Sequence, residues 1–449
     1  MNSFLLQSEA IKLTLCAWIE GLLSHNFALA DVPALVDRPS RKTLIDTAVD
    51  NKLRAQPPHA TLPETAITIE AASTARLANL QGHWQDLITR ADSANIFMNP
   101  ALLRLADESY PDRRCRILLA WQDGPAPRLV GIWGFAVARA PRSVVPLSVL
   151  IAPPMPNGYL STPVIDRDCL DNVLSAMLDY LAADESLPAI VALDAMDAGT
   201  PTMQALSRVL ERGGNPLRIF TQWMRPALAS NLDGKAYLEK ALSSSSRKKL
   251  RQHRRRLSEK GLLHSAVLTE QGAVRNAFEE FLSLEAAGWK GRQGTALLNR
   301  PPDACFARAM IEALSARGDA AIHMLALDER PVSMQVVLHS GPAAFTWKTA
   351  YAEAFHDFSP GMLLWEDYTA ALLADRRTAY VDSCAFDDNG YMAAWIERTS
   401  IAELWFDVRR GRSWTFSMMA QVQGNCLALR QRLKAIRHGY TRRTTQTRK

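Results

Sequence analysis

The chain has 449 residues, more than one ordinary hydrophobic core accommodates, so we expect two domains. Its 48% hydrophobic and 22% charged residues are typical of a soluble globular protein. The net charge of +6 comes from residues 247–260 and 425–449, which each hold eight Lys or Arg, so the remaining chain is mildly acidic. This distribution argues against a broad basic surface built for nucleic acid.

Several kinds of site and location are excluded by the residue spacing. The six cysteines form no C-x-x-C pair and the nine histidines no H-E-x-x-H motif, so we expect neither a disulfide framework nor a metal site. No run approaches the roughly 18 apolar residues of a membrane span. Residues 1–30 have no basic start, and Lys12 and Glu20 interrupt their apolar run. We interpret them as a helix or loose extension, not an export signal, and expect a cytoplasmic protein.

The first half of the chain alternates predicted strands and helices. Hydrophobic periodicity predicts a strand, two helices, a three-stranded meander and then two helix–strand units. The expected strands are 65–71, 114–122, 129–138, 143–152, 189–196 and 217–224, and the expected helices are 72–90, 97–108, 166–183 and 201–212.

The second half repeats the same order of elements, although its residues differ from those of the first half. The strands are expected at 264–270, 320–352 (a meander turning at "DERP"), 378–386 and 400–408, and the helices at 272–287, 303–317, 361–375 and 390–397. The repetition predicts two copies of one α/β unit. We expect an N-terminal extension at 1–62 and two domains at 63–230 and 263–410. A linker at 231–262 joins the domains, and a C-terminal helix with a basic tail follows at 411–449.

The stretch "SSSSRKKLRQHRRRLSEKG" at 243–261 lies between the two copies. Ser246 is a possible helix N-cap, and Leu250 and Leu257 form a narrow apolar stripe, so we predict a basic connecting helix. With that cap, residues 247–249 place three bases in the first turn, where the helix dipole is already positive. We therefore hypothesise that this end of the helix faces an anionic cofactor or substrate, the alternative being a solvated linker.

A second candidate site begins the helix that follows the meander of the second copy. Ser359 suits an N-cap and Pro360 the first helical position, so the amides of Gly361, Met362 and Leu363 would be free to bind a diphosphate. A purely structural helix start is the alternative. The corresponding stretch of the first copy, 151–163, holds four prolines, which lack an N–H. We therefore expect only the second copy to bind a phosphorylated ligand.

The segment "LEAAGWKGRQGTALL" at 284–298 combines three glycines with an aromatic ring and two bases. Trp289 is a candidate lid, and Lys290 and Arg292 are candidate contacts to an anionic substrate. A glycine-terminated helix followed by a solvated loop explains the same residues.

Candidate catalytic groups lie near the ends of the second copy's strands. Lys348, Tyr351 and Asp382 are candidates to supply a general base and a phenolic acid. Cys384 is interpreted as a small core residue rather than a nucleophile. The chain contains neither a G-x-S-x-G motif nor a phosphate-binding P-loop motif.

Three of these stretches together resemble a known family. They are "GWKGRQGTALL", "WKTAYAEAFHDFSPGMLL" and "VDSCAFDDNGYMAAWIERTSIAELWF". In order and spacing they resemble the acetyltransferases of the cellulose-biosynthesis, CelD-like (BioF2-like) type. These are relatives of the Gcn5-related N-acyltransferase (GNAT) fold and, more distantly, of the tandem Fem-type aminoacyl transferases. The similarity is clearest at 240–410, and the single glycine of S-P-G departs from the usual Q/R-x-x-G-x-G/A loop.

The resemblance implies an α/β fold of two tandem GNAT-like domains with mixed, mostly antiparallel central sheets joined by the basic helix. It implies acyl transfer from acetyl-CoA or another acyl-CoA, without a metal, to an amine or hydroxyl of a small-molecule or saccharide acceptor, in polysaccharide or cell-envelope metabolism. The donor diphosphate would meet Ser359, Gly361, Met362 and Leu363. The alternatives are a tRNA-dependent aminoacyl transferase of Fem type and a non-catalytic module that binds polyanions through 247–260 and the tail.

Overall fold

The computed structural model describes residues 66–140, 147–386, 388, 390–411 and 413–446, all within one compact unit, Arg38–Lys449. The N-terminal extension expected at 1–62 lies outside the described residues. Side chains are described up to Arg430 of the C-terminal helix, so the basic tail is described only as backbone, up to Gln446.

The first half follows the predicted order of elements. It contains β1 (Ile67–Ala72), α2 (Thr74–Ala78), α3 (Gln81–Arg90), η2 (Ile96–Met98), α4 (Pro100–Ser109), β2 (Arg114–Gln122), β3 (Arg128–Arg139), β4 (Ser148–Ala152), β5 (Val164–Ile165), α5 (Leu170–Ala183), β6 (Ile190–Asp197), α6 (Pro201–Gly213) and β7 (Leu217–Leu228). Local signals set the ends of α6, where the Thr200 side chain accepts from Met203 N and Gly214 takes a left-handed conformation.

The second half repeats that order. It contains α7 (Gly234–Ala241), α8 (Ser244–Ser258), β8 (Leu263–Leu268), α9 (Gln271–Ala287), α10 (Trp289–Arg292), η3 (Leu297–Asn299), α11 (Pro301–Ser315), β9 (Ala320–Leu327), β10 (Arg330–Ser340), β11 (Ala343–Tyr351), η4 (Glu353–Phe358), α12 (Pro360–Ala374), β12 (Tyr380–Asp382), η5 (Tyr391–Ala394) and β13 (Glu397–Asp407), followed by α13 (Trp414–Gln446). The expected strand 378–386 is reduced to three residues, and the helix expected at 390–397 is only the short η5.

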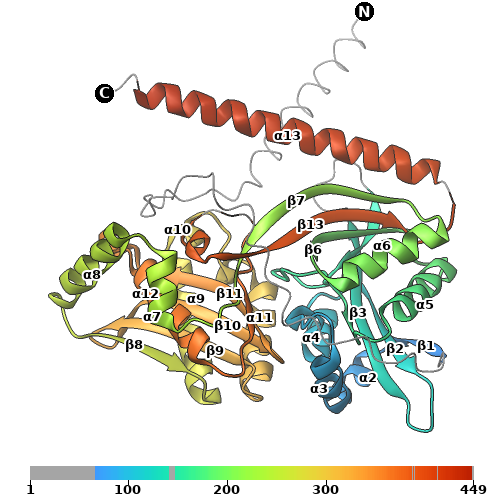
Figure 1. Ribbon diagram of the computed structural model, residues 1–449, viewed down its shortest axis with the longest axis horizontal. Coiled ribbons are helices and arrows are strands. Elements are labelled where there is room, and N and C mark those ends of the chain that lie inside the picture. The colour runs from blue at the N-terminus through green and yellow to red at the C-terminus, as the bar shows by residue number, and fades with distance from the viewer. Residues whose placement is uncertain (1–65, 141–146, 387, 389, 412, 447–449) are drawn as a thin grey trace, which may run out of the picture. The chain divides into compact units, whose positions relative to one another are not determined.

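The strands of both halves join into one mixed sheet (Figure 1). Its order is β1-β2-β3-β4-β6-β13-β7-β12-β11-β10-β9-β8, with β5 beside β3. Pairing is antiparallel except for β4 with β6 and β11 with β12, which are parallel. The expected α/β fold with a mixed, mostly antiparallel sheet is confirmed.

The two halves exchange their last strands at the centre of this sheet. β13 of the second half lies between β6 and β7 of the first, and β7 lies between β13 and β12. Counted from either edge of the sheet, the first five strands thus belong to one half in the same order, and the sixth is the last strand of the other half. Because each half completes its sheet with a strand of the other, the two halves are built into one structure.

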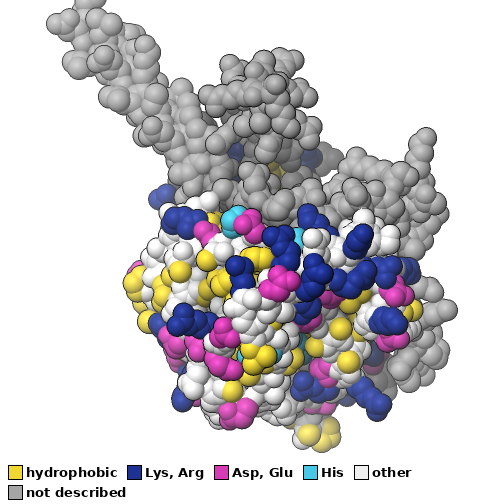
Figure 2. Space-filling view, turned by 90° about the vertical axis from the view of Figure 1, so that its left-hand side faces the viewer, with side chains coloured by type: hydrophobic (Ala, Val, Ile, Leu, Met, Phe, Trp, Pro, Cys, Tyr) yellow, Lys and Arg dark blue, Asp and Glu magenta, His cyan; other side chains and the backbone are white. Residues whose placement is uncertain are grey.

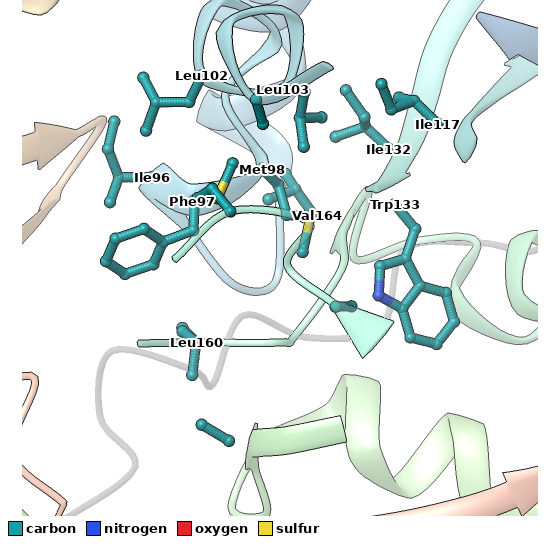
Figure 3. Close-up of a cluster of buried hydrophobic side chains, with 14 of the residues drawn as sticks. Ile96, Phe97, Met98, Leu102, Leu103, Ile117, Ile132, Trp133, Leu160 and Val164 are labelled. Carbon is teal, nitrogen blue, oxygen red and sulfur yellow. The ribbon is translucent and has the colours of Figure 1, made fainter. Parts of the chain in front are cut away.

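In the first half, residues Ser161 and Thr162 lie between the ends of β4 and β6 and hydrogen-bond to the residues at these ends. They thereby close the gap between the two strands. These strands pair from Leu150 to Ala152, and Ser161 then hydrogen-bonds to both Ala152 and Ala195, with Ser161 N to Ala195 O at 2.8 Å. The amide of Asp197 donates to Thr162 Oγ1 at 3.0 Å. Leu160 beside this closure is buried in the cluster drawn in Figure 3. The first half therefore keeps no free strand edge at this point.

The basic segment forms α8, which begins three residues earlier than predicted. Ser243, not Ser246, is the N-cap: its side chain accepts from Ser246 N at 3.1 Å. The bases that begin at Arg247 therefore follow the first turn, and the expected conflict with the helix dipole is wrong. Leu250 and Leu257 are buried in a cluster with α7 and α12, so one face of α8 packs against the second half.

Candidate functional site

A free strand edge distinguishes the second half from the first. β11 pairs with β12 only from Ala343 to Phe345 and then continues to Tyr351. After β12 the chain bonds elsewhere, since Ser383 N donates to Pro226 O and Cys384 N to the Asp382 carboxylate. The backbone of residues 346–351 is thus left without a strand partner on the side of β12 among the described residues.

A loop of the first half lies beside this edge. The indole of Trp347 donates to Asn157 O at 3.0 Å, and Arg225 Nη1 donates to Tyr159 O at 2.9 Å. The Tyr159 ring packs edge-on against Phe386, at 5.4 Å between centroids. Both halves therefore contribute to the surroundings of the free edge.

Asp382, a predicted catalytic residue, is held in a buried ion pair. Its carboxylate accepts from Arg225 Nη1 at 3.2 and 3.3 Å, and both side chains are almost fully buried. Arg225 also donates to Ala385 O and Tyr159 O. This geometry ties β7, β12 and the first-half loop together and favours a structural role for Asp382. Burial raises the pKa of the neighbouring Cys384 thiol, as suits a core residue.

Lys348, another predicted catalytic residue, belongs to a buried cluster of charges on the free-edge segment. One oxygen of Glu285 on α9 lies 3.1 Å from Lys290 Nζ and 3.7 Å from Lys348 Nζ. The other oxygen accepts from Leu297 N at 2.9 Å. Lys290 Nζ also donates to Thr349 O at 2.7 Å. Two ammonium groups thus share a single fully buried carboxylate.

This shared carboxylate does not offset the cost of burying two cations. Burial lowers the pKa of Lys290 and of Lys348 below the ordinary 10.5, and Glu285 opposes the shift in both. Asp303 acts on Lys348 in the same sense as Glu285, whereas the charge of Lys348 lowers the pKa of Lys290 further. Lowering the pKa of a lysine raises its neutral fraction at a given pH, and the neutral amine accepts a proton.

The α10 segment is fixed to the end of β11 by Glu353. That carboxylate accepts from Trp289 N at 2.6 Å and from Arg292 Nη2 at 2.8 and 2.9 Å. Burial, and then the charge of Glu353, raises the pKa of Tyr351, so its phenol stays protonated. The structure therefore brings the predicted substrate-binding residues on α10 close to the predicted catalytic residues of β11.

The start of α12 differs from the predicted cradle. Ser359 is the N-cap residue, as predicted, but it has φ 51° and ψ 53° and its side chain makes no capping hydrogen bond. Its carbonyl accepts from Met362 N at 2.9 Å and Leu363 N at 3.1 Å, so these two amides are not free. The physical reason is ordinary helix geometry, in which the fourth amide already bonds to the cap carbonyl. Gly361 N makes no hydrogen bond within the described residues, and a Cβ there would meet nothing within 4 Å.

Two central residues were missed by the sequence interpretation. Glu285 follows Val274, Phe278 and Phe281 on the buried stripe of α9, and a carboxylate at such a position was a usable signal. Arg225 carried no such signal, because its partner Asp382 is distant in the sequence and meets it only through the strand exchange.

Much of the second half is similar to a known family. The sequence of residues 244–389 matches the family described as the acetyltransferase (GNAT) domain. This segment is therefore similar to a GNAT domain. It runs from α8 to the end of the loop after β12, and thus includes the free edge, the lysine cluster and the start of α12. No curated protein matches the sequence.

Solved structures are similar to this chain over most of its length. A crystal structure of FemX is 12% identical, covering 76% of this chain and 97% of its own, with a TM-score of 0.52. The C-terminal domain of a putative lysylphosphatidylglycerol synthetase from Agrobacterium fabrum is 13% identical, with coverages of 79% and 97% and a TM-score of 0.46. A tandem GNAT protein from the clavulanic acid pathway is 12% identical, with coverages of 77% and 99% and a TM-score of 0.40. The FemX likeness shows the fold alone.

The described residues contain neither a cluster of metal ligands nor a helix that could span a membrane. No three His, Cys, Asp or Glu side chains in this part of the chain converge as metal ligands. None of the helices that are described has the length and apolar character needed to cross a bilayer.

Proposed function

We propose that the second half transfers an acyl group from an acyl-CoA to an amine, with a hydroxyl as the less favoured acceptor. The single observation that carries this proposal is the free edge of β11, which is followed in the chain by the unbonded amide of Gly361 at the start of α12, whereas the corresponding gap of the first half is closed. The proposal includes two domains, 63–230 and 263–410, of which the first serves as a scaffold and does not bind the donor.

The geometry supports one orientation of the donor. Its diphosphate would lie at Gly361 N, where the helix dipole is positive and space is open. Its thiol arm would then follow the free edge from Tyr351 towards Lys348, a distance of about 10 Å at 3.3 Å per residue. The thioester would thereby come to the lysine cluster.

The lysine cluster offers the proton transfer that this chemistry requires. The acceptor nitrogen attacks the thioester carbonyl, forming the C–N bond and breaking the C–S bond. Neutral Lys348 would take the proton that the nitrogen loses, and the thiolate leaving group would be protonated in turn. Lys290 and Glu285 would position Lys348, and the protonated Tyr351 is a candidate donor to the thiolate.

The acceptor and the biological setting are finer parts of the proposal. The CelD-like resemblance favours a saccharide or small-molecule amine in polysaccharide or cell-envelope metabolism, and the scattered cysteines favour the cytoplasm. The basic face of α8 favours one alternative, a Fem-type transfer from aminoacyl-tRNA.

Ligand-induced stabilisation tests the donor assignment. Acetyl-CoA at 100 times its Kd should raise the free energy of unfolding by about 2.7 kcal/mol. Gly361→Leu should abolish this gain, because the new side chain fills the space open to the diphosphate. Gly82→Leu is the matched control, since Gly82 is also the second residue of a helix and also open. Equal stabilisation of both variants, or stabilisation only by RNA, would contradict the proposal.

A further inference from the structure

One side of α8 carries a stripe of bases that faces the segment leading into α12. Lys249, His253 and Arg256 follow each other at intervals of four and three residues, which places them on one side of α8, and Lys260 lies just past the end of the helix at Ser258. The cations of Arg256 and Lys260 lie over the ring of Phe358, at 5.7 and 5.5 Å from its centroid. Phe358 is the last residue of η4.

The position of α8 is fixed by a separate set of contacts. Arg254 donates to Glu366 at 3.0 Å, to Asp367 at 2.7 Å and to Leu363 O at 3.2 Å, all on α12. Leu250 and Leu257 are buried on the same body. The basic stripe is therefore held in place next to the first turns of α12 and does not depend on a ligand for its position.

Arg256 and Lys260 have no carboxylate partner among the described residues. The one acid of the segment, Glu259, lies 3.7 Å from Arg255 instead. Asp357, next to Phe358, lies 3.1 Å from His356 Nε2, and its charge acts on His253 of the stripe. Figure 2 looks onto the side of the molecule where α8 lies and shows Lys and Arg side chains gathered in a band across its upper part. Two cations gathered on one ring without a counter-charge form a compact site for a dianion.

We propose that Arg256 and Lys260 bind a phosphate monoester on the nucleotide of the donor, the 3′-phosphate of CoA. The inference rests on the proposed function, which places the donor diphosphate at Gly361. Phe358 precedes Gly361 by three residues, so the two sites lie within about 11 Å of each other along the chain. A nucleotide with a diphosphate and a separate phosphate monoester has one anionic group for each of these two sites. Arg256 and Lys260 would therefore favour this nucleotide over one that lacks the monoester.

Titration calorimetry with CoA and 3′-dephospho-CoA tests this selectivity. The wild-type protein should bind CoA at least about tenfold more tightly, because hydrogen bonds to charged groups contribute more than neutral ones. In the double variant Arg256→Ala/Lys260→Ala the two ligands should bind equally, with the affinity for dephospho-CoA unchanged. The matched control Lys248→Ala/Arg251→Ala removes the same charge from exposed positions on another side of α8 and should keep the selectivity.

The possible failures are distinguishable. If wild-type protein binds both ligands equally, or if the first double variant keeps the preference, the inference is wrong while the donor assignment stands. If the control loses the preference as well, the effect is general electrostatics and the assigned pair is wrong. If neither ligand binds, the proposed function itself fails and this inference with it. Binding of a short RNA duplex that needs Arg256 and Lys260, without any CoA preference, would assign the pair to RNA.

Discussion

Replacing Glu285 by glutamine is expected to lower the free energy of unfolding by about 3–5 kcal/mol at pH 7. The side chain of Glu285 is fully buried and is shared by Lys290 and Lys348. Glutamine keeps the shape and the acceptor for Leu297 N but removes the carboxylate that the two buried ammonium groups share. Urea denaturation, with the midpoint and slope fitted for both proteins, measures the difference.

The free energy of unfolding should also depend on pH in a defined direction. Each lysine has a folded-state pKa below the 10.5 of the unfolded chain, so between these values the unfolded state binds more protons and stability rises with pH. Without Glu285 the two pKa values should fall further, so the loss in Glu285→Gln should shrink as the pH rises towards 10.5. The control is Glu279→Gln on the same helix, whose exposed pair with Arg308 is worth about 0–1 kcal/mol. A loss for Glu285→Gln no larger than that of the control would refute the charge cluster.

Replacing Lys348 by methionine is expected to lower turnover by about 10²–10⁴-fold without lowering stability. Methionine removes the proposed base but keeps most of the apolar volume of the lysine stem. It also leaves Lys290 and Glu285 as a one-to-one ion pair, so the surplus buried charge disappears. Release of CoA thiol from acetyl-CoA, measured with the best acceptor from a panel of amines, gives turnover, and thermal unfolding gives stability.

A conservative variant separates proton transfer from charge. Lys348→Arg keeps a cation that does not deprotonate, so it should be as inactive as the methionine variant. In the wild-type protein, turnover should rise with pH and level off below 10.5, because the pKa of Lys348 is lowered by its burial. Lys235→Met, at an exposed position on α7, is the control and should retain activity. Activity retained by Lys348→Arg would show that the residue contributes charge and not proton transfer.

The order of elements was predictable from the sequence because hydrophobic periodicity is a local signal. Both halves were recognised as copies, and the strands of each meander lie close to their expected positions. The exchange of β7 and β13 was not predictable, because strand pairing between distant segments leaves no mark in the periodicity of either strand. The same limit explains why β12 was predicted too long: only residues 380–382 find strand partners.

The sequence predicted several residues of the candidate site but not the ion pairs and hydrogen bonds between them. Lys348 and the three α10 residues were selected from residue type and position, and the structure places them around Glu285 and Glu353. The sequence alone did not predict which side chains form ion pairs or hydrogen bonds with one another. Asp382 meets Arg225 through the strand exchange, and Ser359 takes a left-handed conformation at the junction of η4 and α12.

A crystal structure of the protein with CoA tests most directly the claim that only the second half holds the donor. We predict a single CoA per chain, with its diphosphate at Gly361 N and its thiol arm along residues 346–351 of β11. Density for CoA between β4 and β6, where Ser161 and Thr162 close the gap, or at a place remote from β11, would contradict the account.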